Sequence, residues 1–492
     1  MPEDINSIYH SLLSQLNITW PTTADVQLSG ADPVINSVFR IGECTAAVLG
    51  AQAAGVSEIW RRRSGERQPI SVNATAGALA AYSVGYLSQH GYPIPQPEPS
   101  YPLVQLYPAR DGRWIMLHGA FPLLRNGLQN LLGCTMTPTD IADKVAGWDA
   151  FALEQAIADQ GLCGAVARSY EEWLATEQGQ AVAATPLIEI IKIGDTEPMP
   201  FAPAQPGDRP LSGVRVTDLT HVIAGPTIGK TLAEQGAEVM RITSPTQPAL
   251  PPFDVDTGHG KLEALLTLTN PADAAKLRQL VEQSDVFVES YRPGSMAKLG
   301  FSPQNVARMR PGSIYVSVNC YGWAGPWQYR PGWEQLAQVA TGMTVAQGTP
   351  DYPQLQSVYP NDYVTGFLGA LGTLMALLRR ADEGGSYHVR VALCRTAMWM
   401  QQQGQVSRGL LPPPAIPQTE IDRYLLTRDN PAFGPLTYLG PVLDYEKTPS
   451  HWERPTMPLG ANLPVWPVDA GAAVACDLEH GQACGLEAHQ HP

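Results

Sequence analysis

The sequence has few charged side chains, and basic residues are scarcer than acidic ones. Asp, Glu, Lys and Arg make up 16% of its 492 residues, below the roughly 25% of a typical soluble chain. The balance of 32 basic against 46 acidic residues gives a net charge of −14. Such a field repels phosphate backbones, so nucleic acid is not expected as a partner. Apolar residues make up 44%, which is enough for the cores of two or three domains.

Signals for export, membrane insertion and disulfide bonding are also missing. The opening residues, MPEDINSIYH, carry neither the basic nor the apolar segment of a signal peptide. The apolar run 367–378 is too short to cross a bilayer and predicts a buried helix, so no membrane partner is expected. The seven cysteines are scattered and odd in number. They predict reduced thiols in a cytoplasmic protein rather than a disulfide framework.

Familiar cofactor and catalytic motifs are absent. Neither GxGxxG nor GxxxxGK[ST] occurs, which argues against a dinucleotide redox cofactor, and no Ser-His-Asp or Cys-His arrangement can be assembled. A soft metal could suit the spacing of Cys476, His480, Cys484, His489 and His491. These residues lie in the Ala/Gly-rich stretch 467–492, which we expect to be disordered, so no metal site is expected.

The centre of the chain alternates between β-branched runs and helical stretches. Strands are predicted at 214–219, 238–242, 285–289 and 313–318, and helices at 227–235, 271–283 and 304–309. This alternation predicts an α/β fold over 211–330, a Rossmann-like parallel sheet with helices on both faces, and we place the domain that contains it at 206–403.

A second pattern occurs twice. Residues 60–87 and 378–403 each read as the end of an apolar helix, an Arg pair, a Gly-containing turn, a strand and another helix. We interpret residues 1–92 as a partial repeat of the large domain. Residues 93–205 open with a proline run, contain an Asp111-Gly112 hairpin signal and predict a small α+β domain.

Three segments could carry chemistry. The turn 220–226 and the stretch Tyr291–Gly294, with Lys298 one turn later, follow predicted strands, where α/β proteins bind ligands. Both could also be ordinary loops. Asp362 precedes an apolar helix. It is either a helix cap or a nucleophile that the helix N-terminus keeps ionised and aimed into the crevice.

These segments belong to a longer resemblance. The stretch 210–239, centred on Thr220-His221-Val222-Ile223-Ala224-Gly225-Pro226, resembles the opening of class III CoA-transferases, the CaiB/BaiF family. Further similar motifs follow in the family's order at 260–261, 285–289, 292–294, 299–301, 321–326 and 361–366.

The resemblance implies a formyl-CoA/carnitine-type transferase that moves CoA between an acyl-CoA and a carboxylic acid. It implies no resident cofactor, because coenzyme A is a substrate. Asp362 matches the nucleophile that forms an acyl anhydride and then an aspartyl-CoA thioester. The implied CoA contacts are His221, Val222, Ile223, Leu266, Ser290, Tyr291 and Lys298.

The chain departs from the family in several places. The stretch 241–244 lacks the family's acidic residue and following Arg, and 258–262 is a reduced form of a basic segment. The small domain precedes the Rossmann-like part, and residues 404–466 resemble the family's C-terminal return segment. The chain therefore resembles a shortened, rearranged tandem, expected as a homodimer or an internally paired chain. A non-catalytic CoA-binding or assembly subunit remains an alternative. An acyl-CoA racemase is less favoured, because 330–334 lacks the required His.

Overall fold

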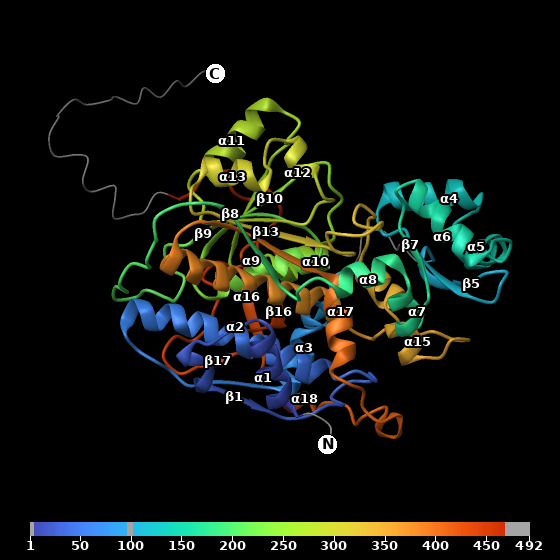
Figure 1. Ribbon diagram of the computed structural model, residues 1–492, viewed down its shortest axis with the longest axis horizontal. Coiled ribbons are helices and arrows are strands. Elements are labelled where there is room, and N and C mark those ends of the chain that lie inside the picture. Colours follow the sequence, from blue (N-terminus) through green and yellow to red (C-terminus); the bar gives the residue numbers. More distant parts are fainter. Residues whose placement is uncertain (1–3, 96–101, 468–492) are drawn as a thin grey trace.

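A seven-stranded sheet forms the centre of the protein, for which the computed structural model describes residues 4–95 and 102–467 (Figure 1). Its strand order is β11-β10-β9-β12-β13-β14-β8, and all neighbours are parallel except β8, which is antiparallel to β14. The strands are β8 (Glu189–Gly194), β9 (Arg215–Leu219), β10 (Glu238–Thr243), β11 (Lys261–Leu265), β12 (Val286–Glu289), β13 (Ile314–Asn319) and β14 (Ser386–Ala392).

Helices cover both faces of this sheet because its strands are apolar on both sides. On β12, Val288 packs into the cluster that contains α9 (Ala224–Glu234) and α16 (Pro360–Glu383). Phe287 packs on the opposite face, under α11 (Pro271–Val281), α12 (Ser295–Lys298) and α13 (Pro303–Met309). The predicted α/β fold with helices on both faces is confirmed. The chain turns sharply after α9 at Gly236, which has a φ of 101°.

Two units with a similar order of elements occur at the places of the predicted repeat, and the repeat itself stays a prediction. Helices α2 (Ile41–Ser64) and α16 each have 24 residues, and each ends at a glycine with positive φ, Gly65 or Gly384. They lead into β2 (Ile70–Asn73) with α3 (Ala74–Ala80), and into β14 with α17 (Leu393–Gln402). The helix predicted to reach 87 ends at Ala80 and is followed by the 3-10 turn η2 (Ser83–Tyr86).

The two long helices pack against each other (Figure 1). A Cβ atom on Gly55 of α2 would lie 3.4 Å from Leu374 Cδ1 of α16, and Arg62 pairs with Asp382 at 2.6 Å near their C-terminal ends. Strand β2 does not enter the main sheet. It lies between β1 (Val26–Ser29) and β17 (Asp444–Tyr445).

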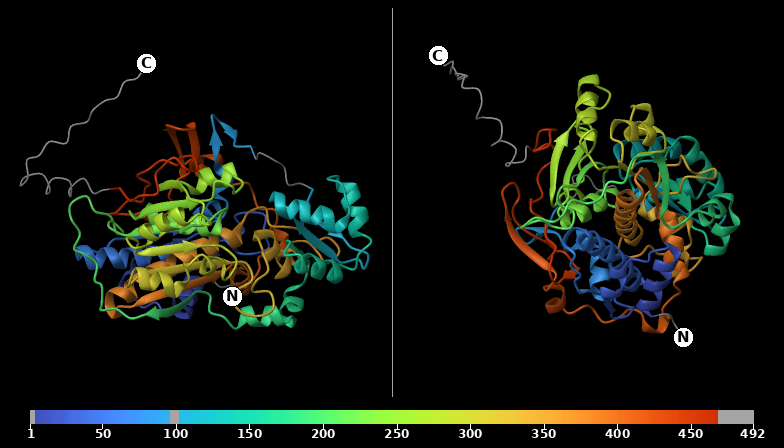
Figure 2. Two further views of the ribbon diagram at one scale, coloured as in Figure 1. Left: turned by 90° about the horizontal axis from the view of Figure 1, so that it is seen from above. Right: turned by 60° about the vertical axis from the view of Figure 1, so that its left-hand side comes forward.

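A smaller α+β unit lies beside the main sheet (Figure 2). Its strands are β5 (Val104–Pro108), β6 (Trp114–His118) and β7 (Gly164–Val166), and the first two form the predicted hairpin around Asp111-Gly112. Helices α4 (Pro122–Leu132), α5 (Pro138–Val145) and α6 (Ala150–Asp159) complete a separate core. Within the range 93–205, α7 (Tyr170–Ala175) and α8 (Glu177–Ala183) follow, and β8 then pairs with β14 of the main sheet. The domain boundaries themselves stay predictions.

The remaining elements join the two ends of the chain. Strands β15 (Leu425–Asn430) and β16 (Gly434–Leu439) form a sheet with β3 (Ser88–Gln89) and β4 (Tyr92–Pro93). The other elements are α1 (Ile5–Gln15), η1 (Pro21–Asp25), α10 (Pro251–Thr257), α14 (Glu334–Ala340), α15 (Met343–Gln347), η3 (Arg408–Leu410) and α18 (Gln418–Ile421). Apart from residue 467, the expected disordered tail with its Cys and His residues lies outside the described residues.

Helix α16 is the hydrophobic centre of the fold. Among the described residues it alone is long and apolar enough to cross a membrane, and 94% of its most apolar window is buried inside the protein. It is therefore a core helix, as predicted for 367–378. The described cysteines are unpaired, and all except Cys134 are buried: Cys44, Cys134, Cys163, Cys320 and Cys394.

Candidate active site

A cavity of about 620 Å³ lies at the carboxyl ends of the parallel strands. Segments after β9, β10 and β12 and at the end of β13 line it, together with the loop before α14, Asp362 of α16 and the start of α4 in the small unit. Ligands of open α/β sheets bind at this edge. The small unit thus contributes one wall of the cavity, although it lies far from the other walls in the sequence.

Asp362 is the carboxylate in this cavity. It is the third residue of α16, and 7% of its surface is exposed to solvent. Tyr359 occupies the N-cap position of α16 and makes no side-chain cap. Among the described residues, none donates a hydrogen bond to the Asp362 side chain. The alternative that Asp362 is a helix cap is therefore wrong, and its carboxyl group is free to meet a ligand.

The surroundings of Asp362 act against an ionised carboxyl group. Burial raises the pKa of Asp362 well above its usual range, and the nearby Glu334 carboxylate raises it further. Desolvation and a second acid thus oppose the helix dipole, which was expected to keep this group ionised, and the ionised state stays a prediction.

Glu334, the first residue of α14, positions the start of α16. Its Oε2 accepts a hydrogen bond from the Asp362 backbone N–H at 2.5 Å, and its Oε1 accepts from Asn361 Nδ2 at 3.0 Å and Gln338 Nε2 at 2.7 Å. Burial raises the pKa of Glu334 to about 7. The segment 330–334 lacks a histidine, and a role for Glu334 was not predicted from the sequence. A glutamate at the start of an apolar helical stretch was the signal available.

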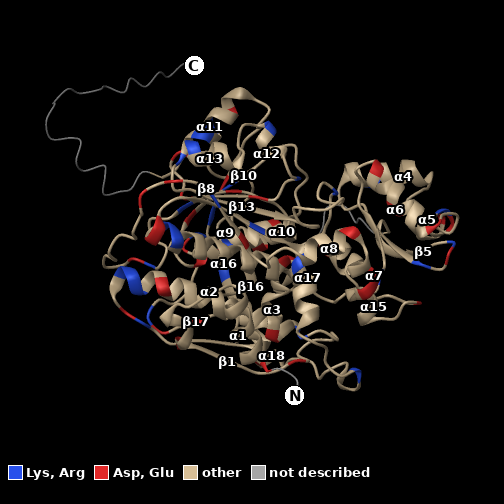
Figure 3. Cartoon of the chain, viewed as in Figure 1, with Lys and Arg blue, Asp and Glu red and all other residues tan. Residues whose placement is uncertain are grey.

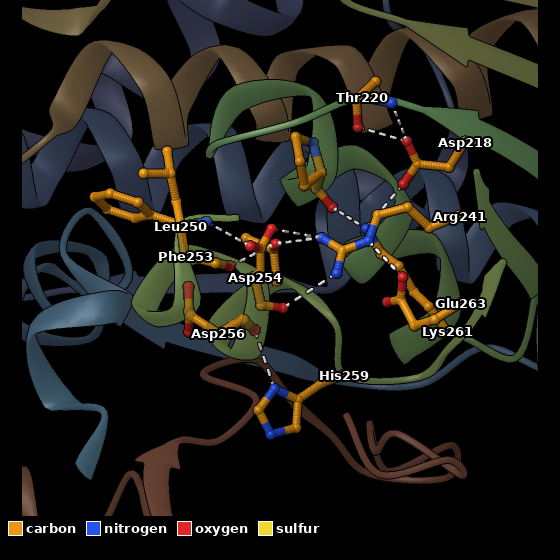
Figure 4. Close-up of polar contacts among 12 residues, drawn as sticks. Asp218, Thr220, Arg241, Leu250, Phe253, Asp254, Asp256, His259, Lys261 and Glu263 are labelled. Carbon is orange, nitrogen blue, oxygen red and sulfur yellow. Dashed lines mark hydrogen bonds and ion pairs between the residues drawn. The ribbon is translucent and has the colours of Figure 1, made fainter. Parts of the chain in front are cut away.

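The turn after β9 is held in an unusual conformation. Val222 has a φ of 71°, which a β-branched residue rarely adopts. Below the turn, Asp218 accepts hydrogen bonds from the backbone and hydroxyl of Thr220 and pairs with Lys261 Nζ at 2.8 Å (Figure 4). The side chains of Asp218 and Lys261 are fully buried. A buried ion pair thus supports the turn that lines the cavity.

Arg241, on the neighbouring strand β10, is also buried and makes its contacts in the interior. Arg241 Nε donates to Glu263 Oε2 at 2.7 Å, and its Nη2 donates to the carbonyl oxygen of Asp254 at 3.3 Å (Figure 4). Arg241 is 1% exposed. Neither Arg241 nor Lys261 lines the cavity, although both lie in the segments where the sequence departs from the family pattern.

Aromatic rings form one wall of the cavity. Trp333 stacks on Phe121 with centroids 5.0 Å apart, and His221 lies with its edge toward both rings, at 5.9 and 6.2 Å. Tyr291 lies 5.7 Å from His221. Burial lowers the pKa of His221 to about 4, so this ring is neutral at pH 7. Phe121 and Trp333 were not predicted, since nothing in their local sequence marks them as cavity residues.

Five of the predicted CoA-contact residues line this cavity with Asp362: His221, Val222, Ile223, Ser290 and Tyr291. The Ser290 hydroxyl and His221 Nδ1 are buried and have no hydrogen-bond partner among the described residues. Leu266 does not line the cavity and packs in the core beneath α11, and Lys298 is exposed on α12. Roles in CoA binding stay predictions for all seven residues. Across 4–95 and 102–467, no group of His, Cys, Asp and Glu is arranged to hold a metal ion.

The chain is similar to one protein family and to several known proteins. Residues 211–420 match the model of CoA-transferase family III. An acetyl-coenzyme A transferase, nodX, of Hypoxylon pulicicidum is 36% identical over 61% of this chain and 54% of its own length. A probable fatty acyl-CoA transferase, Rv3272, of Mycobacterium tuberculosis is 32% identical over 39% of this chain and 52% of its own.

A crystal structure of a CAIB/BAIF family protein from Brucella suis is 28% identical, with a TM-score of 0.37, covering 40% of this chain and 56% of that one. The chain spans about half the length of the curated relatives that it matches.

Proposed function

Residues 211–420 belong to CoA-transferase family III, the CaiB/BaiF family, and from this premise we propose that the protein transfers coenzyme A between carboxylic acids. One observation carries the proposal. Asp362, at the position of the family's nucleophile, lies in a cavity at the strand ends with no hydrogen bond to its carboxyl group among the described residues. A carboxylate engaged in capping or ion pairing would be a weaker nucleophile toward a thioester.

The proposed reaction exchanges acyl groups through Asp362. Its ionised carboxylate attacks the thioester carbonyl of the donor, CoA thiolate leaves, and a mixed anhydride forms. The thiolate then attacks the aspartyl carbonyl, which releases the donor acid and leaves an aspartyl-CoA thioester. The acceptor carboxylate attacks that thioester, and the thiolate returned by this step attacks the acceptor's acyl carbonyl. Acyl-CoA product leaves and Asp362 is regenerated. No metal or redox cofactor is required by these steps.

Three features of the chain would serve this reaction. Burial of Asp362 raises its basicity and hence its nucleophilicity once it is ionised. Glu334 holds the backbone N–H of Asp362 and so fixes the first turn of α16. The unpartnered Ser290 hydroxyl in the cavity wall offers a polar contact to the substrate.

The direct test is covalent. After incubation with acyl-CoA, intact-protein mass should show an acyl or CoA adduct, which hydroxylamine should remove. Asp362→Asn keeps the side-chain shape and should abolish both adduct and transfer while the fold survives. Asp382→Asn, near the other end of α16 and exposed, is the matched control and should keep full activity.

A non-catalytic CoA-binding subunit is the second candidate. It is favoured by the burial of Arg241 and Lys261 away from the cavity. CoA binding without an adduct on Asp362, and without transfer for any acid, would support this alternative against the transferase.

A further inference from the structure

The cavity that contains Asp362 is lined mostly by apolar residues. They include Val318 and Cys320 at the end of β13, Leu393 at the start of α17, and Trp333, whereas Asn319 and Ser290 are among the polar residues of the lining. From the small unit, the wall continues with Phe121 and the first turn of α4, a helix that Figure 3 shows almost entirely in tan. An acyl group attached to Asp362 would therefore meet hydrocarbon and aromatic surface.

The two cations of the cavity are directed elsewhere. Arg292 and Arg330 are the only lysine or arginine side chains among the described residues that line the cavity. Arg292 Nη2 donates to the carbonyl oxygen of Gly161 at 3.2 Å. Arg330 Nη2 donates to Gln155 Oε1 at 3.1 Å, and its guanidinium lies 4.2 Å from the Trp327 ring centroid. Both arginines thus connect the cavity rim to the small unit.

The charge next to Asp362 has the wrong sign for a second carboxylate. Only burial and Glu334 act on the Asp362 carboxyl, and no cation does. A buried carboxylate without a partner cation costs several kcal/mol. A second acid group on the substrate would face this cost together with repulsion from Glu334.

On this basis, and resting on the proposed transferase function, we propose that the acyl groups exchanged at Asp362 are those of monocarboxylic acids with an uncharged hydrocarbon or aryl tail. The tail lies against Trp333 and Phe121. Dicarboxylic acids are excluded. The exchange stays balanced: a donor acyl-CoA and an acceptor carboxylate give the donor carboxylate and the acceptor acyl-CoA.

A binding measurement tests this inference independently of the proposed reaction. Hexanoyl-CoA and adipoyl-CoA have acyl chains of equal length and differ by one terminal carboxylate. Calorimetry on the full chain should show that hexanoyl-CoA binds at least about tenfold more tightly than adipoyl-CoA. Adipoyl-CoA should bind no more tightly than CoA. Equal affinity for the two thioesters, or a preference for adipoyl-CoA, would overturn the inference.

Variants of the aromatic wall sharpen the test. Phe121→Arg should shift the preference toward adipoyl-CoA, whereas Phe121→Leu should retain the preference for hexanoyl-CoA. Leu410→Ala, an exposed position outside the cavity, is the control and should change neither affinity. If the binding preference holds but no thioester supports transfer, the proposed reaction fails while the ligand class stands. Transfer to adipate as fast as to hexanoate would refute the ligand class alone.

Discussion

Asp362 and Glu334 bring two buried acids close together, and this pairing decides when the nucleophile is ionised. A carboxylate attacks only in its ionised form, so the rate of transfer should rise with pH through the raised pKa of Asp362. Glu334→Gln removes the neighbouring negative charge and should move the kcat/KM profile to lower pH. The pH–rate profiles of wild type and variant check this, and an unshifted profile would contradict the coupling.

The same two carboxyl groups should also make the stability of the fold depend on pH. A carboxyl whose pKa is higher in the folded than in the unfolded chain stabilises the fold in acid, and this stabilisation is lost as pH rises through the folded pKa. Raising the pKa of Glu334 from 4.5 to about 7 corresponds to about 3 kcal/mol. From pH 4.5 to pH 8, the unfolding free energy of wild type should therefore fall relative to that of Glu334→Gln by up to that amount. Urea unfolding measures the difference, and parallel curves would exclude it.

Single residues also show where sequence reasoning reached its limit. His221 and Tyr291 follow strands directly, and strand ends meet at one edge, so their place in the cavity was predictable. Leu266 follows β11 in the same way, but it faces the core beneath α11 whereas Leu265 is 38% exposed. Alternation along a strand sends neighbours to opposite faces, and the sequence does not say which face holds the ligand.

At the scale of elements, strands β9, β10 and β11 are joined by buried ion pairs as well as by hydrogen bonds. Lys261→Met leaves Asp218 buried without its cation and should destabilise the protein by about 3–5 kcal/mol. Asp218→Asn/Lys261→Met removes both charges and keeps an acceptor for Thr220, so it should recover part of the loss. Chemical denaturation of the single and double variants checks the prediction, and strictly additive losses would contradict the pairing.

Helices α9 and α16 approach closely at a glycine one turn beyond Asp362. A Cβ atom on Gly366 would lie 2.6 Å from Thr227 Cβ and 2.7 Å from the carbonyl oxygen of Ala224. Gly366→Ala should therefore cost about 1–3 kcal/mol and lower transfer by displacing the start of α16. At Gly409 the nearest atom would be 3.7 Å away, so Gly409→Ala should change neither stability nor activity. Equal effects of the two variants would argue against this contact.

The elements that the sequence predicted well are those with strong local signals. The central strands and helices follow from their apolar periodicity and from turn residues such as Gly236. Strand β8 was not assigned to the main sheet, because its pairing with β14 joins residues about 200 apart and leaves no local mark. The contact between α4 and the strand-end loops was missed for the same reason.

At the scale of the molecule, the N-terminal repeat completes the core of the C-terminal half. Helix α2 is buried from Ile41 to Ile59, and much of that surface lies against α16. The two helices thus pack against each other within one chain, and both the internally paired tandem and the homodimer stay predictions.

A fragment of residues 206–492 would lose both α2 and β8. The apolar face of α16 and the edge of β14 would then be exposed. We expect this fragment to aggregate or to melt far below the full chain, and to lack acyl-CoA turnover. Light scattering and calorimetry on the purified fragment measure the outcome. A monomeric fragment with full turnover would show that the N-terminal half is dispensable.

The packing of α2 on α16 also has a consequence for folding during synthesis on the ribosome. Helix α2 begins at Ile41 and α16 at Pro360, so the ribosome completes the partner about 320 residues later. At roughly 5–20 residues per second, this delay amounts to about 15–60 s. During that interval the nascent chain carries a helix of 24 residues that can pack against α1 and α3, while the surface that meets α16 still lacks its partner. The newborn polypeptide should therefore depend on ribosome-associated chaperones, and its yield should respond to translation speed more than to the stability of the finished protein.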